Sequence, residues 1–326
     1  MRAIDTIKNI WKIEDLRNRI LTTLLLVMVY RFGTYVVIPG VDPKALTALQ
    51  EQTRGGLLAL LDMFSGGAFA NASIFALGIM PYISASIVMQ LLAIAVPSFQ
   101  KLQREGESGR RKINQWTRYL TVAILLFQGP TYLVNLSVQL KAVGAALPAG
   151  FFFTIYSTII LAAGSMFVLW LGEKITDKGV GNGISFIILV GIIARLPHSL
   201  FQEFISRTTE KTGGLVMFLF EMLFLLLVIA GAILLVQGTR KVPVQYAKRI
   251  IGNKQYGGAR QYIPLKVNAA NVMPIIFAQA IMFIPISIVG FASNQESSGF
   301  WAAFMDNTGF WYNFVFAVLI ILFTYF

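Results

Sequence analysis

The sequence predicts an all-α membrane protein, a polytopic bundle of helices that crosses a lipid bilayer about eight times. Apolar residues fill 56% of the 326 positions and charged residues only 13%, too little charge to cover a water-soluble globule of this length. Apolar runs of roughly 20 residues, enough for a helix to cross a hydrocarbon core of about 30 Å, recur along the chain. Basic residues gather in alternate loops, which is typical of membrane topology.

The apolar runs follow one another at intervals that leave short loops between them. They lie near residues 20–38, 72–96, 116–138, 151–171, 184–204, 214–237, 268–291 and 310–326. The runs are continuous and do not alternate between apolar and polar residues, which disfavours a transmembrane β-barrel. The eighth run stops at Phe326 within apolar sequence and without a charged flank, so we expect the chain to be truncated there.

The distribution of Lys and Arg predicts that the N-terminus is cytoplasmic. Basic residues number five in 1–19, five in 97–115, two in 172–183 and seven in 238–267, nineteen in all, against six in the opposite loops. The remaining two, Arg31 and Arg118, are expected at helix ends, where long side chains can snorkel to the interface. No small-residue cleavage site follows the first run, which predicts an uncleaved first helix.

The residue inventory leaves little for catalysis. The chain has no cysteine and one histidine, His198, so a thiolate or histidine metal cluster is excluded and no cofactor is expected. The net charge of +12 does not indicate a nucleic-acid-binding domain, because the basic residues are spread over loops between apolar runs. The glycine strings 179–183 and 257–258 lack the setting of a phosphate loop and are interpreted as turns.

A short apolar stretch, Gly55 to Asn71, lies between the first two runs. It is too short to cross a bilayer and is broken by Gly66 and Gly67. It is expected to be a short helix or re-entrant piece on the outer side, next to a cavity, because irregular backbone at membrane depth needs protein or water around it. An amphipathic helix lying on the outer leaflet is an equally good interpretation of the spacing.

The second and seventh runs are the least lipid-like. Both are predicted to carry prolines inside a helix, together with polar side chains that need partners from other helices, water or a pore. These residues are Pro81, Ser84, Ser86 and Gln90 in the second run, and Asn268, Asn271, Pro274, Gln279 and Pro285 in the seventh. Taken singly, each is better explained as a contact between packed helices.

Other residues within the runs carry weaker signals. Ile79 and Ile83 are four apart, as are Ile184 and Ile188, so each pair shares a helix face, which by itself indicates only a core or lipid-facing position. Glu221 is an intramembrane acid and a candidate ion site, but no basic partner is evident in a neighbouring run, so it is expected to reach the interface or a packing partner.

The loop from Gln237 to Lys266 is long, basic and free of acids. Val242, Val244, Tyr246 and Tyr256 favour an ordered structure. A basic loop of this length exceeds what membrane orientation alone requires. We therefore expect it to dock a large polyanionic or acidic cytosolic partner such as ribosomal RNA. Anionic lipid headgroups are the alternative partner.

Five strings resemble the SecY family, the pore-forming subunits of the bacterial Sec protein translocase. They are FSGGAFANASIFALGIMPYISASIVMQLL (64–92), EGESGRRKINQWTRY (105–119), GVGNGIS (179–185), VPVQYAKR (242–249) and PLKVNAANVMPIIFA (264–278). The resemblance implies a clamshell of ten helices in two pseudo-symmetric halves, of which this chain would hold about eight. The N-terminal half would be 1–204 and the partial C-terminal half 205–326.

The resemblance also implies roles for individual residues. The hydrophobic pore ring would comprise Ile79, Ile83, Ile184, Ile188 and Ile276. The plug, within 55–71, would include Leu57, Leu60, Asp62, Met63, Phe64, Gly66 and Gly67. The lateral gate would use Ser84, Gln90 and Asn268. The surface that docks a ribosome or motor would present Arg240, Lys241, Lys248, Arg249, Lys254 and Arg260.

The function implied is that of a protein-conducting channel in the bacterial plasma membrane, not an enzyme. It would pass unfolded secretory polypeptides across and release signal or transmembrane segments sideways into lipid. Its partners would be small SecE- and SecG-like subunits, the SecA ATPase motor or a translating ribosome, substrate chains and lipids. The alternative is an ion-coupled secondary transporter, which would need a paired acid or a solute-binding cluster. A membrane-embedded enzyme is a third reading that the residue inventory disfavours.

Overall fold

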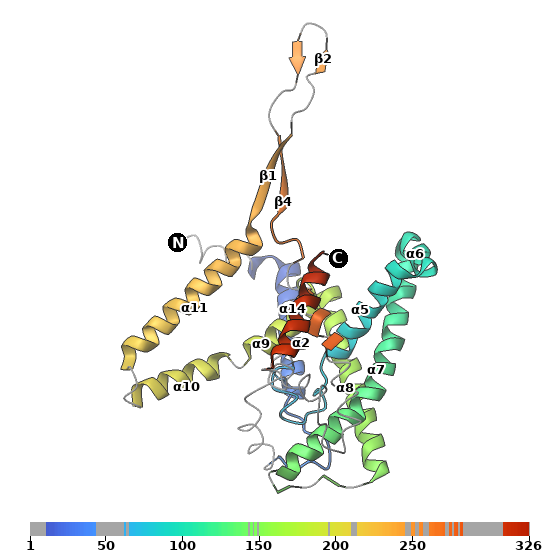
Figure 1. The fold of residues 1–326 in the computed structure, drawn as a ribbon, viewed down its shortest axis with the longest axis vertical. Helices are drawn as coiled ribbons and strands as arrows, with labels where there is room; N and C mark the ends of the chain where they lie inside the picture. The colour runs from blue at the N-terminus through green and yellow to red at the C-terminus, as the bar shows by residue number, and fades with distance from the viewer. Residues whose placement is uncertain are drawn as a thin grey trace. The chain divides into compact units, whose positions relative to one another are not determined.

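A computed structural model of the chain gives its fold (Figure 1). It describes residues 11–43, 62, 65–142, 144–145, 147–148, 150–194, 196–209, 214–244, 249–251, 254–256, 261–270, 274–275, 277–279, 281–282 and 309–325. The chain forms two compact units. The first unit contains Met1–Pro197 with Phe277–Leu319, and the second contains His198–Ile276 with Ile320–Phe326.

The first unit is a bundle of helices with short connections. Its helices are α2 (Glu14–Gly33), α5 (Met80–Ala95), α6 (Pro97–Arg104), α7 (Glu107–Ala142), α8 (Phe151–Lys178) and α9 (Gly183–Ile193). The long helices α7 and α8 pack on each other, α5 packs on α7, and α2 and α9 both pack on α8 (Figure 1). At Val96 the chain turns by 98° from α5 into α6.

Two clusters of apolar side chains form the core of this unit. One lies between α7 and α8 and is centred on Leu125 and Leu161, both 0% exposed. The other joins α2, α8 and α9 through Tyr30, Ile175 and Ile187. The burial of these two clusters is the main contact that stabilises the bundle. The remaining surface of α7 and α8 carries many exposed aromatic and aliphatic side chains.

The second predicted span begins later than the sequence suggested. Residues 65–79 form consecutive turns, nearly all of them buried, and the helix starts only at Met80. The prediction of a helix from residue 72, with Pro81 in its interior, is therefore wrong. Pro81 lies in the first turn of α5, where the missing N–H costs nothing because the first N–H groups of a helix have no partner within it.

The buried turn segment (residues 65–79) is tied to the end of α2 by a short antiparallel bridge. Val37 pairs with Ser73, the Ile38 amide donates to the Ala72 carbonyl at 2.9 Å, and the Ile74 amide donates to the Val36 carbonyl at 2.9 Å. Ala72 adopts a positive φ of 43° and is fully buried. Backbone that leaves the helical pattern here is satisfied by protein groups, as membrane depth requires.

The second unit consists of two helices and an extended β-hairpin. The helices are α10 (Leu196–Thr209), whose first two residues belong to the first unit, and α11 (Gly214–Gln237). Strands β1 (Thr239–Val244) and β4 (Gln261–Lys266) pair antiparallel, as do β2 (Arg249–Ile251) and β3 (Lys254–Tyr256). The Val267 amide closes the base of the hairpin on the Gly238 carbonyl at 3.0 Å. The predicted order in this loop is confirmed.

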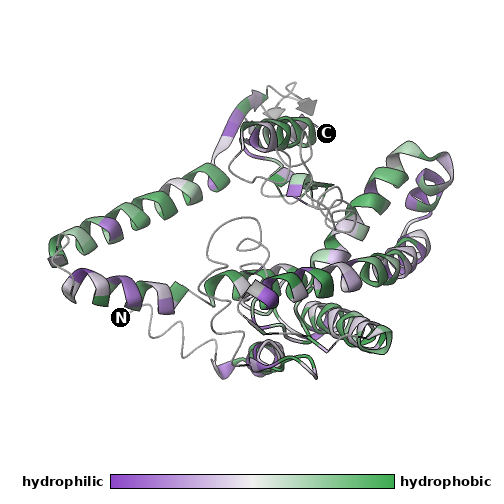
Figure 2. Ribbon diagram, turned by 60° about the horizontal axis from the view of Figure 1, so that its bottom comes forward, coloured by the Kyte–Doolittle hydropathy of each residue, from purple (hydrophilic) through white to green (hydrophobic). Residues whose placement is uncertain are grey.

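Within the part of the chain that the structure describes, four helical stretches are long and apolar enough to cross a membrane, or five if α5 and α6 count as one bent span. They are Glu107–Lys141, Phe151–Lys178, Gly183–Thr208 and Gly214–Gln237. Figure 2 shows α11 as hydrophobic along most of its length, and none of its residues is buried, which is expected of a helix whose solvent is lipid. The predicted eighth span appears as α14 (Phe310–Tyr325). Most of the seventh, 268–291, lies outside the described residues, so the count of eight stays a prediction.

Candidate pore, plug and gate

Four of the five predicted ring isoleucines lie in one cluster. Ile79 belongs to its buried core with 6% exposure, and Ile83, Ile184 and Ile188 pack against that core half-buried. Ile276 lies outside the described residues. Ile79 is the N-cap residue of α5 and accepts from the amide of Ile83 at 3.1 Å. Ile184 and Ile188 lie in α9 and share a helix face because they are four residues apart.

Local sequence explains how α9 presents its two isoleucines. The Asn182 side chain caps the helix by accepting from the amides of Ile184 and Ser185 at 3.1 and 3.3 Å. Close packing on α8 requires glycine, because a Cβ on Gly183 would lie 2.0 Å from the Gly172 carbonyl oxygen. This close approach brings the Ile184 side chain against α8 and fixes its direction.

A small hollow opens beside the isoleucines. Its cavity volume is about 10 Å³, roughly the space needed to hold one water molecule. The side chains and backbone around it are mostly apolar: Ser65, Leu77, Gly78, Ile79, Met80, Ile83 and Ile188. The hollow thus borders both the isoleucine cluster and the buried turn segment.

The described part of the predicted plug is a tightly bonded turn. Asp62 is 2% exposed, and its Oδ1 accepts from the Ala70 amide at 2.8 Å while its carbonyl accepts from the Gly67 amide at 2.9 Å. The Ser65 hydroxyl donates to the Asp62 carbonyl and accepts from the Phe69 amide. Asp62 therefore uses its carboxylate to close a turn. Leu57, Leu60, Met63 and Phe64 lie outside the described residues.

Glycine is required in this turn. Gly66 and Gly67 have φ values of 67° and 92°, a region that residues with a Cβ rarely adopt. Gly66 also approaches α9 so closely that a Cβ there would lie 3.1 Å from Gly191 Cα. Residues 65–71 are buried turns and not an exposed helix, so the alternative of an amphipathic helix on the membrane surface is wrong for this part of the stretch.

Three side chains that the sequence did not single out for this role bond the turn segment. The Tyr30 hydroxyl donates to the Ser65 carbonyl at 3.1 Å, Arg31 Nη1 donates to the Gly66 carbonyl at 2.7 Å, and the Tyr132 hydroxyl donates to the Phe69 carbonyl at 2.9 Å. The sequence offered one signal for this role: Arg31 lies in an apolar run, where a cation needs a hydrogen-bond acceptor.

The predicted gate residues are in different surroundings. Ser84 is 7% exposed and donates to the Met80 carbonyl at 3.2 Å, one turn earlier in α5. Gln90 is exposed and donates to Ser86 Oγ at 3.4 Å. Asn268 is half-buried and follows β4 in the second unit. An exposed amide such as that of Gln90 on an apolar helix is suited to a surface that meets changing partners.

The basic loop presents its charges on a hairpin. Arg240 pairs with Leu265 and Lys241 with Pro264 across the β1–β4 ladder. Both basic side chains are exposed and, as neighbours in a strand, they point to opposite faces. Arg249 and Lys254 lie in β2 and β3, whereas Lys248 and Arg260 lie outside the described residues. The exposed charge on the hairpin therefore includes Arg240 and Lys241 of the β1–β4 ladder.

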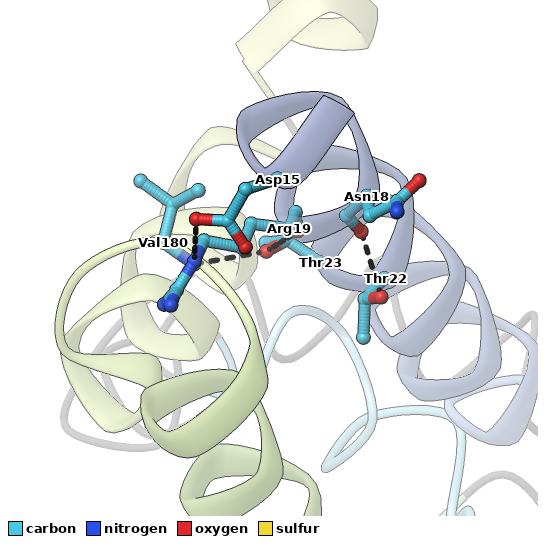
Figure 3. Close-up of polar contacts among 6 residues, drawn as sticks. All are labelled: Asp15, Asn18, Arg19, Thr22, Thr23 and Val180. Atoms are coloured by element: carbon cyan, nitrogen blue, oxygen red, sulfur yellow. Dashed lines mark hydrogen bonds and ion pairs between the residues drawn. The ribbon is translucent and has the colours of Figure 1, made fainter. Parts of the chain in front are cut away.

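The glycine string 179–183 is a turn, as predicted, and hydroxyls fix it. The Thr23 hydroxyl of α2 donates to the Arg19 carbonyl at 2.8 Å and accepts from the Val180 amide at 3.2 Å (Figure 3). On the other side, the Thr176 hydroxyl accepts from the Gly183 amide at 2.9 Å. These bonds connect α2, α8 and the start of α9.

Glu221 has a packing partner, as expected, but this partner is basic, and the expectation that Arg118 lies at a helix end is wrong. Glu221 has a basic partner, because Arg207 Nη2 lies 2.7 Å from its Oε1. The two charges offset each other, which removes the reason to treat Glu221 as an ion site. Arg118 is not at a helix end but inside α7, and its Nη2 lies 2.6 Å from Glu173 Oε1 on α8.

The fold is that of known protein-conducting channels. A structure described as that of a protein conducting channel matches with a TM-score of 0.61 and 15% identity, covering 94% of this chain and 70% of that one. Sec61 in the canine ribosome–channel complex from the endoplasmic reticulum matches with a TM-score of 0.54 and 13% identity over 94% of this chain and 69% of that one. These matches define the fold class, a polytopic bundle of membrane helices like that of the two channels.

Sequence comparison gives the family. The SecY family model matches residues 73–326. The protein translocase subunit SecY of Aquifex aeolicus is 38% identical over 98% of this chain and 75% of its own length, and that of Thermotoga maritima is 41% identical over 98% and 73%. The chain belongs to the SecY family. It is a subunit of a protein-conducting channel, and the alternative of an ion-coupled transporter has no support.

Proposed function

We propose that unfolded secretory polypeptides pass this channel through a ring formed by Ile79, Ile83, Ile184, Ile188 and Ile276. The observation that carries the proposal is the meeting of four of these isoleucines in one cluster beside a small hollow, Ile79 and Ile83 from the N-cap and first turn of α5 and the other two from α9. Branched apolar side chains hinder ions because a narrow apolar constriction loses its water. They also offer a passing chain no hydrogen bonds that would hold it.

Residues 65–71, the described end of the predicted plug, are proposed to form part of it, on the outer side of the ring. Ser65 lines the same hollow as Ile83 and Ile188, so this part of the plug lies directly beside the ring. A SecY structure with a TM-score of 0.52 and 16% identity, over 84% of this chain and 59% of that one, is described as one whose plug domain stabilises the closed state. The burial of most of residues 65–71 supports the same role here.

The second and seventh spans are proposed to form a lateral gate, with Ser84, Gln90 and Asn268 as its polar residues. Gln90 is exposed on α5, a helix made mostly of apolar residues. A gate that opens toward lipid lets a signal or transmembrane segment leave sideways, driven by the transfer of its apolar side chains out of water. The halves that separate would be 1–204 and 205–326.

The basic hairpin is proposed to dock a ribosome or the SecA motor in the cytosol. The residues proposed for contact are Arg240, Lys241, Lys248, Arg249, Lys254 and Arg260. Related channels are described as bound to ribosomes, among them the idle yeast Ssh1 complex on the 80S ribosome, with a TM-score of 0.61 and 15% identity over 87% of this chain and 60% of that one. Small SecE- and SecG-like subunits complete the proposed complex.

The proposed location is the bacterial plasma membrane, with the N-terminus in the cytoplasm. The excess of Lys and Arg in alternate loops supports this orientation. The chain would act as a conduit without catalytic chemistry of its own, and its partners would supply the driving force. Substrate chains and the surrounding lipids are its remaining contacts.

Ion flux through the resting channel tests the ring. Ile83→Ser combined with Ile188→Ser is expected to make reconstituted vesicles leak ions, because two hydroxyls at the constriction favour its wetting. The matched control is Leu189→Ser, which places the same change on the neighbouring residue of α9, where the side chain is 48% exposed. Equal flux in the double variant and the parent would refute the ring assignment.

A further inference from the structure

The buried turn segment is held by more than its own turns. Three donors, from two helices, bond three of its backbone carbonyls: Tyr30 on Ser65, Arg31 on Gly66 and Tyr132 on Phe69. Tyr30 and Arg31 are neighbours near the end of α2, and Tyr132 lies in α7. We call these three side chains the carbonyl clamp.

The clamp adds side-chain donors to carbonyls of the turn. The carbonyls of Ser65 and Phe69 also accept from the amides of Ala68 and Ala72 at 3.4 and 3.3 Å, so the bonds of the clamp are additional to those of the turn. The left-handed residues Gly66 and Gly67 break any helical ladder at this point. A hydroxyl without a partner is costly when buried, and Tyr30 and Tyr132 are only 2% and 5% exposed. The two buried hydroxyls therefore depend on the carbonyls of the segment while it is in this position.

The three hydrogen bonds of the carbonyl clamp can break together when the turn segment moves. Each is a single hydrogen bond to backbone, so it does not depend on the side chains of the segment. Arg31 is also held from its other side, where Nη2 donates to the Tyr35 hydroxyl at 3.1 Å and the guanidinium lies over the Tyr35 ring at 5.4 Å. Arg31 thus keeps a partner when the segment leaves, which lowers the cost of opening.

We propose that Tyr30, Arg31 and Tyr132 are positioning residues that hold the turn segment in its resting place beside the isoleucine cluster. This inference rests on the proposed function in one respect, namely that release of the segment opens a path for ions. The holding of the segment is a separate property and can be measured by itself.

Thiol labelling measures the position of the segment directly. Residues 1–326 contain no cysteine, so Ala68→Cys introduces the only thiol within them, at a side chain that is 0% exposed. In the full-length subunit assembled into its channel complex, labelling by a water-soluble maleimide reports how often the segment opens. Arg31→Gln is expected to speed labelling about tenfold, since a hydrogen bond to a charged group is lost, and Tyr30→Phe and Tyr132→Phe somewhat less.

Two variants serve as matched controls. Tyr156→Phe removes a hydroxyl that donates to the Pro39 carbonyl at 3.1 Å, a bond outside the turn segment. Arg118→Gln removes a guanidinium that pairs with Glu173. Both should leave labelling as in the parent. Unchanged labelling in the three clamp variants would overturn the proposal, and so would equal acceleration in clamp and control variants, because that would show general loosening.

Ion flux in the same samples separates this inference from the proposed function. Faster labelling together with increased flux supports both. Faster labelling with flux unchanged in the clamp variants and in the Ile83→Ser, Ile188→Ser variant would leave the clamp standing and refute the seal. Increased flux in the isoleucine variant, with labelling of the clamp variants unchanged, would leave the ring standing and refute the clamp.

Discussion

Arg207 on α10 bridges two carboxylates, with Nη2 2.7 Å from Glu221 of α11 and Nε 2.8 Å from Glu203 of its own helix. The pair that joins the helices is about two-thirds buried, at 28% and 33% side-chain exposure. Phe204 and Phe218 pack edge to face beside it, with ring centroids 5.4 Å apart. One arginine therefore connects α10 to α11 and balances an acid that would otherwise lie alone in an apolar helix.

Loss of this arginine should weaken the connection between α10 and α11. Arg207→Gln is expected to lower the free energy of unfolding by roughly 1–3 kcal/mol, because two carboxylates lose a charged donor and then face each other. Glu221→Gln should cost less, since the amide still accepts a hydrogen bond. The measurement is the denaturation midpoint in mixed detergent. Arg17→Gln is the control, because its pair with Glu14 spans 3.9 Å and is exposed; equal losses there would contradict the prediction.

Glycines at helix contacts should tolerate no methyl group. A Cβ on Gly164 of α8 would lie 2.0 Å from the Ile74 carbonyl oxygen in the buried turn segment. Because that atom is backbone, Gly164→Ala should cost about 1–3 kcal/mol of stability through overpacking. Gly231→Ala in α11 has nothing within 4 Å of the new atom and should stabilise by up to about 1 kcal/mol. Thermal unfolding of both variants gives the comparison, and a stable Gly164→Ala variant would refute the close approach.

Charge on the hairpin should govern docking. Arg249→Glu is expected to weaken binding to ribosomes or to the motor while membrane insertion stays normal, and to lower the dependence of ribosome binding on salt by about one phosphate contact. The readout is co-sedimentation with ribosomes across a series of salt concentrations. Lys141→Glu makes the same charge change at the end of α7, in a loop predicted on the opposite side of the membrane. A variant at Arg249 that binds like the parent would refute the role of the hairpin.

Crosslinking should locate the path of the substrate. A photoreactive residue at Gln90, exposed on α5, is expected to form adducts with a stalled secretory chain, because the proposed gate borders that chain. The same probe at Leu226, 59% exposed on α11, should label lipid. Adducts at Leu226 and none at Gln90 would show that the gate lies elsewhere.

Several elements could be predicted because their signals are local. The apolar run of α11 and the acid-free charge of the hairpin are properties of consecutive residues, and the structure has a helix and paired strands there. The spacing of Ile79 and Ile83 predicted a shared face. From the residues alone these isoleucines could not be distinguished from other apolar residues, because isoleucine is common both in cores and on lipid-facing surfaces. Only the family resemblance assigned them to a ring.

Other elements could not be predicted because their partners are distant. Tyr30 and Ser65 are 35 residues apart, and Tyr132 and Phe69 are 63 apart. Pairs at such separations leave no periodic signal in the chain. The late start of α5 has the same origin, since residues 72–74 pair with 36–38 and not with a helical neighbour.

Composition and pattern alone determined that this chain resides in a membrane, that it has long apolar helices, and that most of its basic residues gather between the apolar runs, because transfer free energy acts on each residue separately. The tertiary structure decided which groups within those helices are paired. Arg207 meets Glu221, and Arg31 meets the Gly66 carbonyl, because an apolar medium gives a polar group no partner except one that folding brings to it.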